Sequence, residues 1–184
     1  MRNGDVLYFS PRYKFIDLDF DGKSVTLDAF RDRVEGFYLG PAENLKSDCD
    51  AFAVGLLCVS TIDFLARLAF GPNTKVGERF VKWLRTNVKE FNVGNRASQF
   101  YDDFRCGLVH EGLIKNAGEF SYEFPDLVKS INGALMVNPR ALLRAVKDSF
   151  QTYLKQLNSD DRAYSLFNST MERDFEGDMK LAAR

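Results

Sequence analysis

Apolar residues recur at helical spacing through most of this chain. From position 49 to 72 nearly every residue is apolar, which predicts a buried central helix that Gly71-Pro72 ends. A second, amphipathic helix is predicted by apolar residues three or four positions apart: Val76, Phe80, Leu84, Val88 and Phe91. Another helix is expected to begin at Gly94 or Asn95 and to end at about Gly112.

The C-terminal third continues this pattern. Asn138-Pro139 combines a good N-cap residue with a proline suited to the first helical turn. A long amphipathic helix is predicted beyond it by Leu142, Leu143, Val146, Phe150, Tyr153, Leu154 and Leu157. We expect the more polar tail, residues 160–184, to be helical and to pack on the bundle or on a partner.

Two short stretches have the pattern of β-hairpins instead. Residues 13–27 alternate around Asp21-Gly22, which predicts a hairpin in an N-terminal extension, residues 1–27. A second small hairpin is expected around residues 116–118. Between them, residues 28–40 are predicted to form a short helix that ends at Gly40, before Pro41. The fold class is therefore mainly all-α: one helical-bundle domain, residues 1–184, with one or two small β-hairpins.

Composition narrows the choice of function. The chain has 184 residues, 45% of them apolar, and a net charge of −1, so it has no overall basic character. Contact with nucleic acid would need a local patch. One candidate patch is a stripe of basic residues that recur every three to four positions along a predicted helix: Lys75, Arg79, Lys82, Arg85 and Lys89. Such a stripe could follow an RNA backbone, or it could be an ordinary solvated face of the helix.

Location and metal content are also constrained. No stretch contains the roughly 20 consecutive apolar residues of a membrane helix, and the N-terminus lacks the long apolar stretch of a signal peptide. The three cysteines, Cys49, Cys58 and Cys106, are widely spaced, which indicates free thiols in a reducing cytoplasm. With a single histidine and no CxxC motif, we expect no metal site and no cofactor.

The single histidine lies in the stretch FRCGLVHEG, residues 104–112. At about 100° per residue, the core face of this helix consists of Phe100, Tyr101, Phe104 and Leu108. Arg105 and His110 lie about 140° apart on the opposite side. The outward face between and beside them carries Asp102, Asp103, Cys106 and Val109.

An imidazole and a guanidinium on one face are typical of phosphodiester chemistry. Imidazole can exchange a proton near neutral pH, and guanidinium presents paired donors to phosphate oxygens. On RNA, the 2′-hydroxyl is an internal nucleophile, so a base and a cation suffice without metal. The alternative is a structural or merely exposed histidine and an arginine in an ordinary surface ion pair.

The stretch YDDFRCGLVHEG, residues 101–112, resembles the Arg-x4–6-His signature of HEPN domains, the higher eukaryotes and prokaryotes nucleotide-binding superfamily. This resemblance implies a bundle of four to five helices that forms a homodimer, with two motifs meeting in one cleft. It also implies that the protein is a metal-independent endoribonuclease. Such enzymes act in toxin–antitoxin systems, in anti-phage defence or in RNA processing. Arg105 and His110 match the catalytic pair, and a nucleotidyltransferase-type antitoxin is an expected partner.

Neighbouring residues have both a supporting and an ordinary interpretation. Asp102 and Asp103 would either orient His110 or be solvated charges on the helix surface. Cys106 would be either redox-sensitive or a small residue at a helix contact. Lys115 would either hold a phosphate group or be an ordinary loop lysine. Cys106 follows the motif arginine where the family often has a polar residue such as Asn, and a thiol is a weak hydrogen-bonding substitute. The alternative function is therefore a catalytically silent HEPN-like module that binds nucleotide or RNA, or serves in assembly. A coincidental motif in a helical interaction domain is the third possibility.

Overall fold

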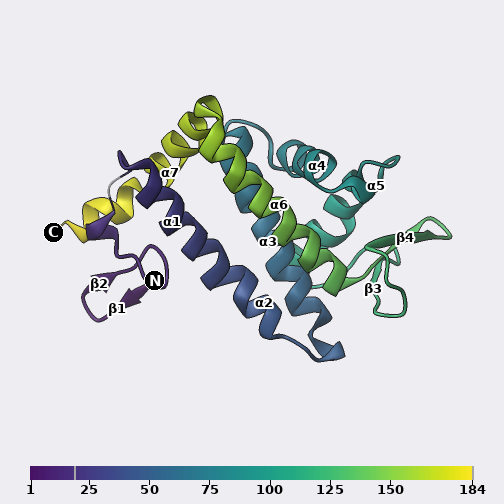
Figure 1. Ribbon diagram of the computed structural model, residues 1–184. Coiled ribbons are helices and arrows are strands. Elements are labelled where there is room, and N and C mark those ends of the chain that lie inside the picture. Colours follow the sequence, from purple (N-terminus) through teal and green to yellow (C-terminus); the bar gives the residue numbers. More distant parts are fainter. Residues whose placement is uncertain (19, 184) are drawn as a thin grey trace.

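The computed structural model describes residues 1–18 and 20–183, and helices dominate this part of the chain (Figure 1). The predicted mainly α-helical fold class is confirmed. Asp19, within the predicted first hairpin, and Arg184, the last residue of the predicted tail, lie outside the described residues.

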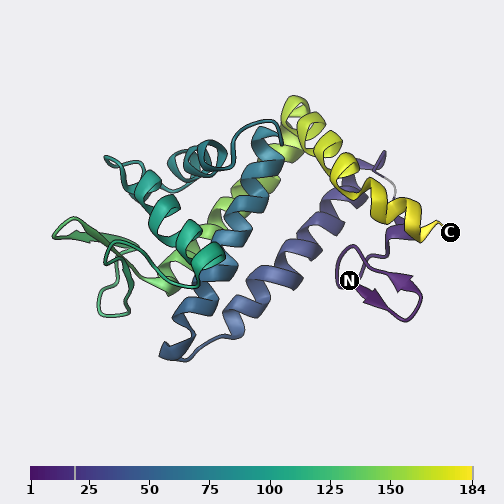
Figure 2. The ribbon, with the colours of Figure 1, turned by 180° about the vertical axis from the view of Figure 1, so that it is seen from behind.

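Helix α3, Ala51–Phe70, is the central helix of the bundle. It packs against α4, Val76–Asn87, against α6, Pro139–Ser159, and against α7, Asp161–Ala182. Figure 1 shows α6 in front of α3, and Figure 2 shows α3 from the opposite side. The helix ends as predicted at Gly71, whose φ of 77° suits glycine better than other residues.

The same helix corrects one expectation from the sequence. Asp48–Phe70 is long and apolar enough to cross a membrane by length and composition, although it contains charged residues such as Asp63 and Arg67. About 50% of the apolar window is buried inside the protein. A buried core helix meets the same criteria, so this feature is weak evidence for a membrane span.

The predicted helix over residues 28–40 is longer at both ends. Helix α1, Lys23–Val34, continues through a π-helical turn, Glu35–Leu39, into α2, Gly40–Asn44. Pro41 therefore lies inside a continuous helix instead of ending it. In the π-turn the Gly40 N–H bonds to the Glu35 carbonyl, and this wider winding just before Pro41 accommodates a ring that would clash in a regular α-helix.

The predicted hairpin over residues 13–27 is wrong. This stretch contains a 3₁₀ turn, Phe15–Asp17, and the start of α1. Its alternating apolar residues, among them Phe15, Leu18 and Phe20, are buried in the core instead of forming one face of a sheet. The N-terminal hairpin lies earlier in the chain, where β1, Arg2–Asn3, pairs with β2, Val6–Leu7.

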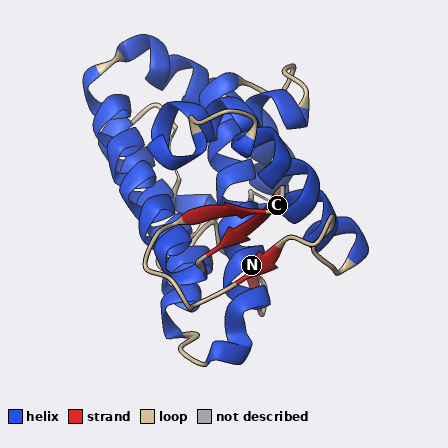
Figure 3. Ribbon diagram, turned by 90° about the vertical axis from the view of Figure 1, so that its right-hand side faces the viewer, coloured by secondary structure: helices blue, strands red, loops and turns tan. Residues whose placement is uncertain are grey.

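A small three-stranded sheet follows the motif helix (Figure 3). The predicted turn at Asn116-Ala117 exists, with positive φ at both residues, but it does not form a hairpin. Instead β3, Glu119–Phe120, pairs in parallel with β5, Ala134–Val137. The hairpin is formed by β5 and β4, Val128–Ile131, around Asn132-Gly133.

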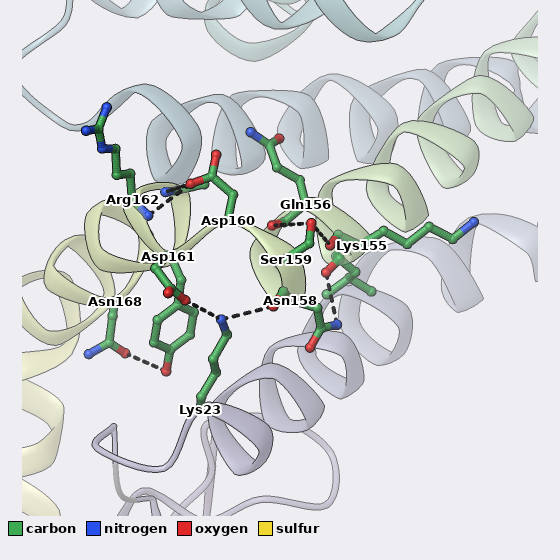
Figure 4. A network of polar contacts seen from close by, with 12 residues as sticks. Lys23, Lys155, Gln156, Asn158, Ser159, Asp160, Asp161, Arg162 and Asn168 are labelled. Atoms are coloured by element: carbon green, nitrogen blue, oxygen red, sulfur yellow. Dashed lines mark hydrogen bonds and ion pairs between the residues drawn. The ribbon is translucent and has the colours of Figure 1, made fainter.

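The two C-terminal helices begin with side-chain caps. The predicted N-cap Asn138 accepts hydrogen bonds from the N–H groups of Arg140 and Ala141, and Asp160 caps α7 in the same way. Figure 4 shows the corner between these helices, where Lys23 Nζ bonds to the Asn158 carbonyl and to Asp161. The start of α1 is thereby attached to the α6–α7 junction.

The predicted helical tail is confirmed and packs on the bundle. Arg67 of α3 donates two hydrogen bonds to the Asp174 carboxylate, at 2.6 and 2.7 Å. Farther along α7, the Phe175 ring contacts Phe9, and Arg33 lies 4.8 Å from the Phe175 centroid. The N-terminal hairpin and the end of α7 accordingly lie at the same side of the molecule (Figure 1).

Candidate functional site

The Arg-x4-His motif lies on one continuous helix, as predicted. It begins with α5, Arg96–Phe100, and continues through two π-helical turns, Tyr101–Arg105 and Gly107–Glu111. Gly112 ends it in the left-handed conformation, with φ 69°. Three of the four predicted core-face residues are buried, since Phe100 and Phe104 are inaccessible and Leu108 is 8% exposed, whereas Tyr101 is only half-buried.

Arg105 and His110 contact each other directly. Arg105 Nη1 donates to His110 Nε2 over 2.8 Å, and the histidine is exposed. In a regular α-helix these side chains would lie about 140° apart. In a π-turn the hydrogen bonds join residues five apart, which brings the fifth residue back towards the first.

This contact involves the nitrogen of His110 that faces Arg105. Arginine has only donors, so a hydrogen bond in this contact needs the lone pair of His110 Nε2 as its acceptor. A general base would use this same lone pair, which in this structure faces Arg105.

Asp63 of α3, which is not among the residues predicted for the site, anchors the arginine. Its Oδ2 accepts hydrogen bonds from Arg105 Nε at 3.1 Å and from Nη2 at 2.5 Å. Burial lowers the pKa of Arg105, but the hydrogen bond and charge of Asp63 outweigh it, so the pKa is raised. The signal in the sequence was a carboxylate in an otherwise apolar helical segment.

The two motif aspartates have different environments. Asp102 is exposed, whereas Asp103 is 1% exposed, which contradicts its assignment to the outward face. Asp103 Oδ1 accepts from Asn116 Nδ2 at 2.6 Å, and its backbone carbonyl accepts from the Lys115 N–H. The wider π-turns change the direction of this side chain, and Asp103 thereby connects the helix to the loop after it.

Gly107 allows this loop to return close to the helix. The Leu113 N–H bonds to the Gly107 carbonyl, and a Cβ at position 107 would lie 2.3 Å from the Leu113 carbonyl oxygen. Lys115, the predicted phosphate-holding residue, lies in the loop and forms an ion pair with Glu111 at the end of the helix. The loop thus brings a lysine to the same end of the helix as His110.

Cys106 is half-buried next to Tyr101. Burial raises the pKa of Tyr101, and the neighbouring Cys106 raises it further. The guanidinium of Arg105 lies 5.7 Å from the Tyr101 ring centroid, within the range of a cation–π contact. Cys106 therefore contacts the side chain that supports Arg105.

The predicted basic stripe is interrupted in the structure. Lys75, Lys82, Arg85 and Lys89 are exposed, or largely so, but Arg79 is only 6% exposed and points inwards. Its Nη2 lies 3.7 Å from Asp63 Oδ1 and its Nη1 donates to the Thr74 carbonyl. The correction follows from helix phase, because Arg79 lies next to the buried Phe80 on the side that meets α3.

A cavity of about 270 Å³ opens between these elements. Its polar lining comes from Ser60, Asp63 and Arg67 of α3, from Arg79 of α4 and from Arg105 of the motif helix, and Val109 borders it. Within residues 1–18 and 20–183, no group of three or more His, Cys, Asp or Glu side chains is arranged to hold a metal ion.

No protein-family model matches the chain, and no match is found among curated proteins or solved structures. The motif's own residues and geometry are therefore the basis for assigning a function.

Proposed function

We propose that this chain is a HEPN-type endoribonuclease that cleaves RNA without a metal ion. The observation that carries this proposal is the 2.8 Å contact between Arg105 Nη1 and His110 Nε2 at the exposed end of the motif helix. It is supported by the helical fold around the motif and by Asp63, which orients the arginine.

The two side chains have complementary roles in this reaction. His110 Nε2 accepts the proton of the ribose 2′-hydroxyl, and the 2′-oxygen bonds to phosphorus. The bond to the 5′-oxygen breaks, and that oxygen takes a proton from a second general acid or from water. Arg105 stabilises the charge that develops on the phosphate oxygens. The products carry 2′,3′-cyclic phosphate and 5′-hydroxyl ends.

One histidine per chain supplies one proton-transfer group, which favours a two-fold homodimer with both His110 rings in one cleft. The surface next to His110 is suited to an interface, because Val109 and Leu113 are large apolar residues that are 43% and 46% exposed. We further propose a cytoplasmic location and, as in toxin–antitoxin or defence systems, an antitoxin partner. Sedimentation that showed a monomer at micromolar concentration would contradict the dimer.

The test of the proposed activity compares wild type with His110→Ala on end-labelled single-stranded RNA in the presence of EDTA. Wild type should cleave, and His110→Ala, equally folded by circular dichroism, should not. An RNA with a single 2′-deoxy residue should resist cleavage at that position. Equal cleavage by both proteins, or activity that returns only with magnesium or manganese, would contradict the proposal.

One observation favours a second candidate, the catalytically silent module. The lone pair of His110 Nε2 is occupied by Arg105, and Arg105 is itself held by Asp63, so the pair must separate before the histidine can act as a base. Cys106 in place of a stronger hydrogen-bonding residue points in the same direction. Wild type that binds RNA or nucleotide without cleaving RNA would support this alternative.

A further inference from the structure

Arg79 has an unusual environment for a charged side chain. It is 6% exposed, and its Nε is buried without a hydrogen-bond partner among the described residues. Its remaining polar contacts are a 3.2 Å hydrogen bond to the Thr74 carbonyl and a 3.7 Å approach to Asp63 Oδ1. Burying a guanidinium with so few partners is costly unless a further anion compensates its charge.

The charges around the adjacent cavity do not balance. Arg67 is paired with Asp174 at 2.6 Å, and Arg105 is paired with Asp63 at 2.5 Å. Asp63 Oδ2 is therefore committed to Arg105, whereas Asp63 Oδ1 is buried without a hydrogen-bond partner among the described residues and lies 3.7 Å from Arg79 Nη2. The cavity thus has one guanidinium in excess of the carboxylates that pair with its arginines.

We propose that this cavity is an oxyanion subsite that binds a phosphate group through Arg79. A guanidinium presents planar N–H donors to phosphate oxygens, and Arg79 is one of the residues that line the cavity. The volume of about 270 Å³ is sufficient for a phosphate group, and Ser60 adds a hydroxyl group to the lining.

The position of the cavity indicates which phosphate it binds. Arg105 and Val109 line it, so it adjoins the proposed Arg105–His110 site on the side of α3. In an RNA substrate the subsite would bind a phosphate that neighbours the scissile one. This assignment rests on the proposed function, whereas the binding of free phosphate does not.

The first experiment measures the melting temperature in phosphate and in chloride at equal ionic strength. At about ten times its Kd, inorganic phosphate should raise the melting temperature of wild type by about 3 to 6 °C. Arg79→Gln should lose this response. Arg85→Gln, an exposed arginine on the same helix, is the matched control and should retain it.

A second variant covers the case in which Arg79→Gln does not fold. Ser60→Glu introduces a carboxylate into the cavity, where it would pair with Arg79 as the proposed anion does. It should raise the melting temperature in chloride and abolish the response to phosphate. No phosphate response in wild type, or an undiminished response in Arg79→Gln or Ser60→Glu, would overturn the subsite.

The RNA assignment is tested with a 2′-O-methyl oligonucleotide, which cannot be cleaved. Loss of one phosphate contact in Arg79→Gln should weaken binding and reduce the slope of log Kd against log salt by about one. A normal phosphate response with unchanged oligonucleotide binding would support the subsite and assign it to free phosphate. Both readouts are independent of cleavage, so failure of the proposed ribonuclease activity would be detected separately.

Discussion

Arg105 Nη1 lies 2.8 Å from His110 Nε2, so the arginine occupies the lone pair that a general base would use. The arginine is also the residue expected to bind the substrate phosphate. Nη1 carries two N–H groups and one of them donates to His110, so phosphate binding would release the imidazole by drawing the guanidinium towards the phosphate. We expect the histidine to become available as a base only when substrate is present.

If the pair acts as a unit, the effects of removing its members should not add. His110→Ala should lower RNA cleavage by about 10² to 10⁴, the usual contribution of general acid–base catalysis. Arg105→Ala should have an effect of similar order, and the double variant should be little worse than either single variant. Single-turnover rates on labelled RNA measure this. A double variant whose loss is the product of the two single losses would contradict the shared role.

Asp63→Asn should destabilise the protein, since Asp63 is the carboxylate that faces both Arg79 and Arg105. Removing its charge leaves two partly or fully buried guanidinium groups with weaker partners. The expected loss in the free energy of unfolding is about 1.5 to 3 kcal/mol, the range for hydrogen bonds to charged groups. Urea unfolding measures this loss, and Asp148→Asn, an exposed position on α6, should cost much less. Equal stabilities of the two variants would contradict the anchoring role.

The stability contributed by Asp174 should depend on pH. The hydrogen bond from Arg67 lowers the pKa of Asp174 below its ordinary value of 3.8. A lowered folded-state pKa means that the stabilisation is present above about pH 4 and is lost as the pH falls through the lowered value. The difference in unfolding free energy between wild type and Asp174→Asn should therefore shrink towards zero in acid. A difference that is constant from pH 7 to pH 2 would contradict this.

The cysteines should differ in their reactivity towards iodoacetamide. Cys49 is exposed and should be alkylated in the native protein, whereas burial raises the pKa of the Cys58 thiol and shields it from reagent. Cys58 should react only when the protein unfolds, and the partly accessible Cys106 should react at an intermediate rate. Mass spectrometry of peptides over time gives the three rates. Equal rates at Cys49 and Cys58 in the native state would show that the core opens readily.

The features that could be predicted from the sequence are those with local signals. The N-cap at Asn138 and the helix ends at Gly71 and Gly112 depend on one or two residues each, and all three are confirmed. The hairpin at Asn132-Gly133 also has a local signal, a dipeptide typical of tight β-turns, although the predicted hairpin lies at residues 116–118. Pro41 misled the prediction because its usual helix-ending effect is removed by the π-turn before it.

The candidate site was predictable only in part. Arg105 and His110 are five positions apart and their contact depends on one helix, so a motif can indicate it. Asp63 and Arg79 come from two other helices, and which way each points depends on how those helices pack. Arg79 has the spacing of an exposed basic stripe, and only the packing of α4 on α3 shows that it is buried.

In the motif helix, a change in helical pitch can compensate for a change in the number of residues between Arg105 and His110. An α-helix places residues four apart on one face, whereas a π-turn does so for residues five apart. The same contact between an arginine and a histidine is therefore compatible with different lengths of intervening chain, provided that the local pitch changes with the length. An insertion or deletion between Arg105 and His110 would alter the winding of the helix before it separated the pair.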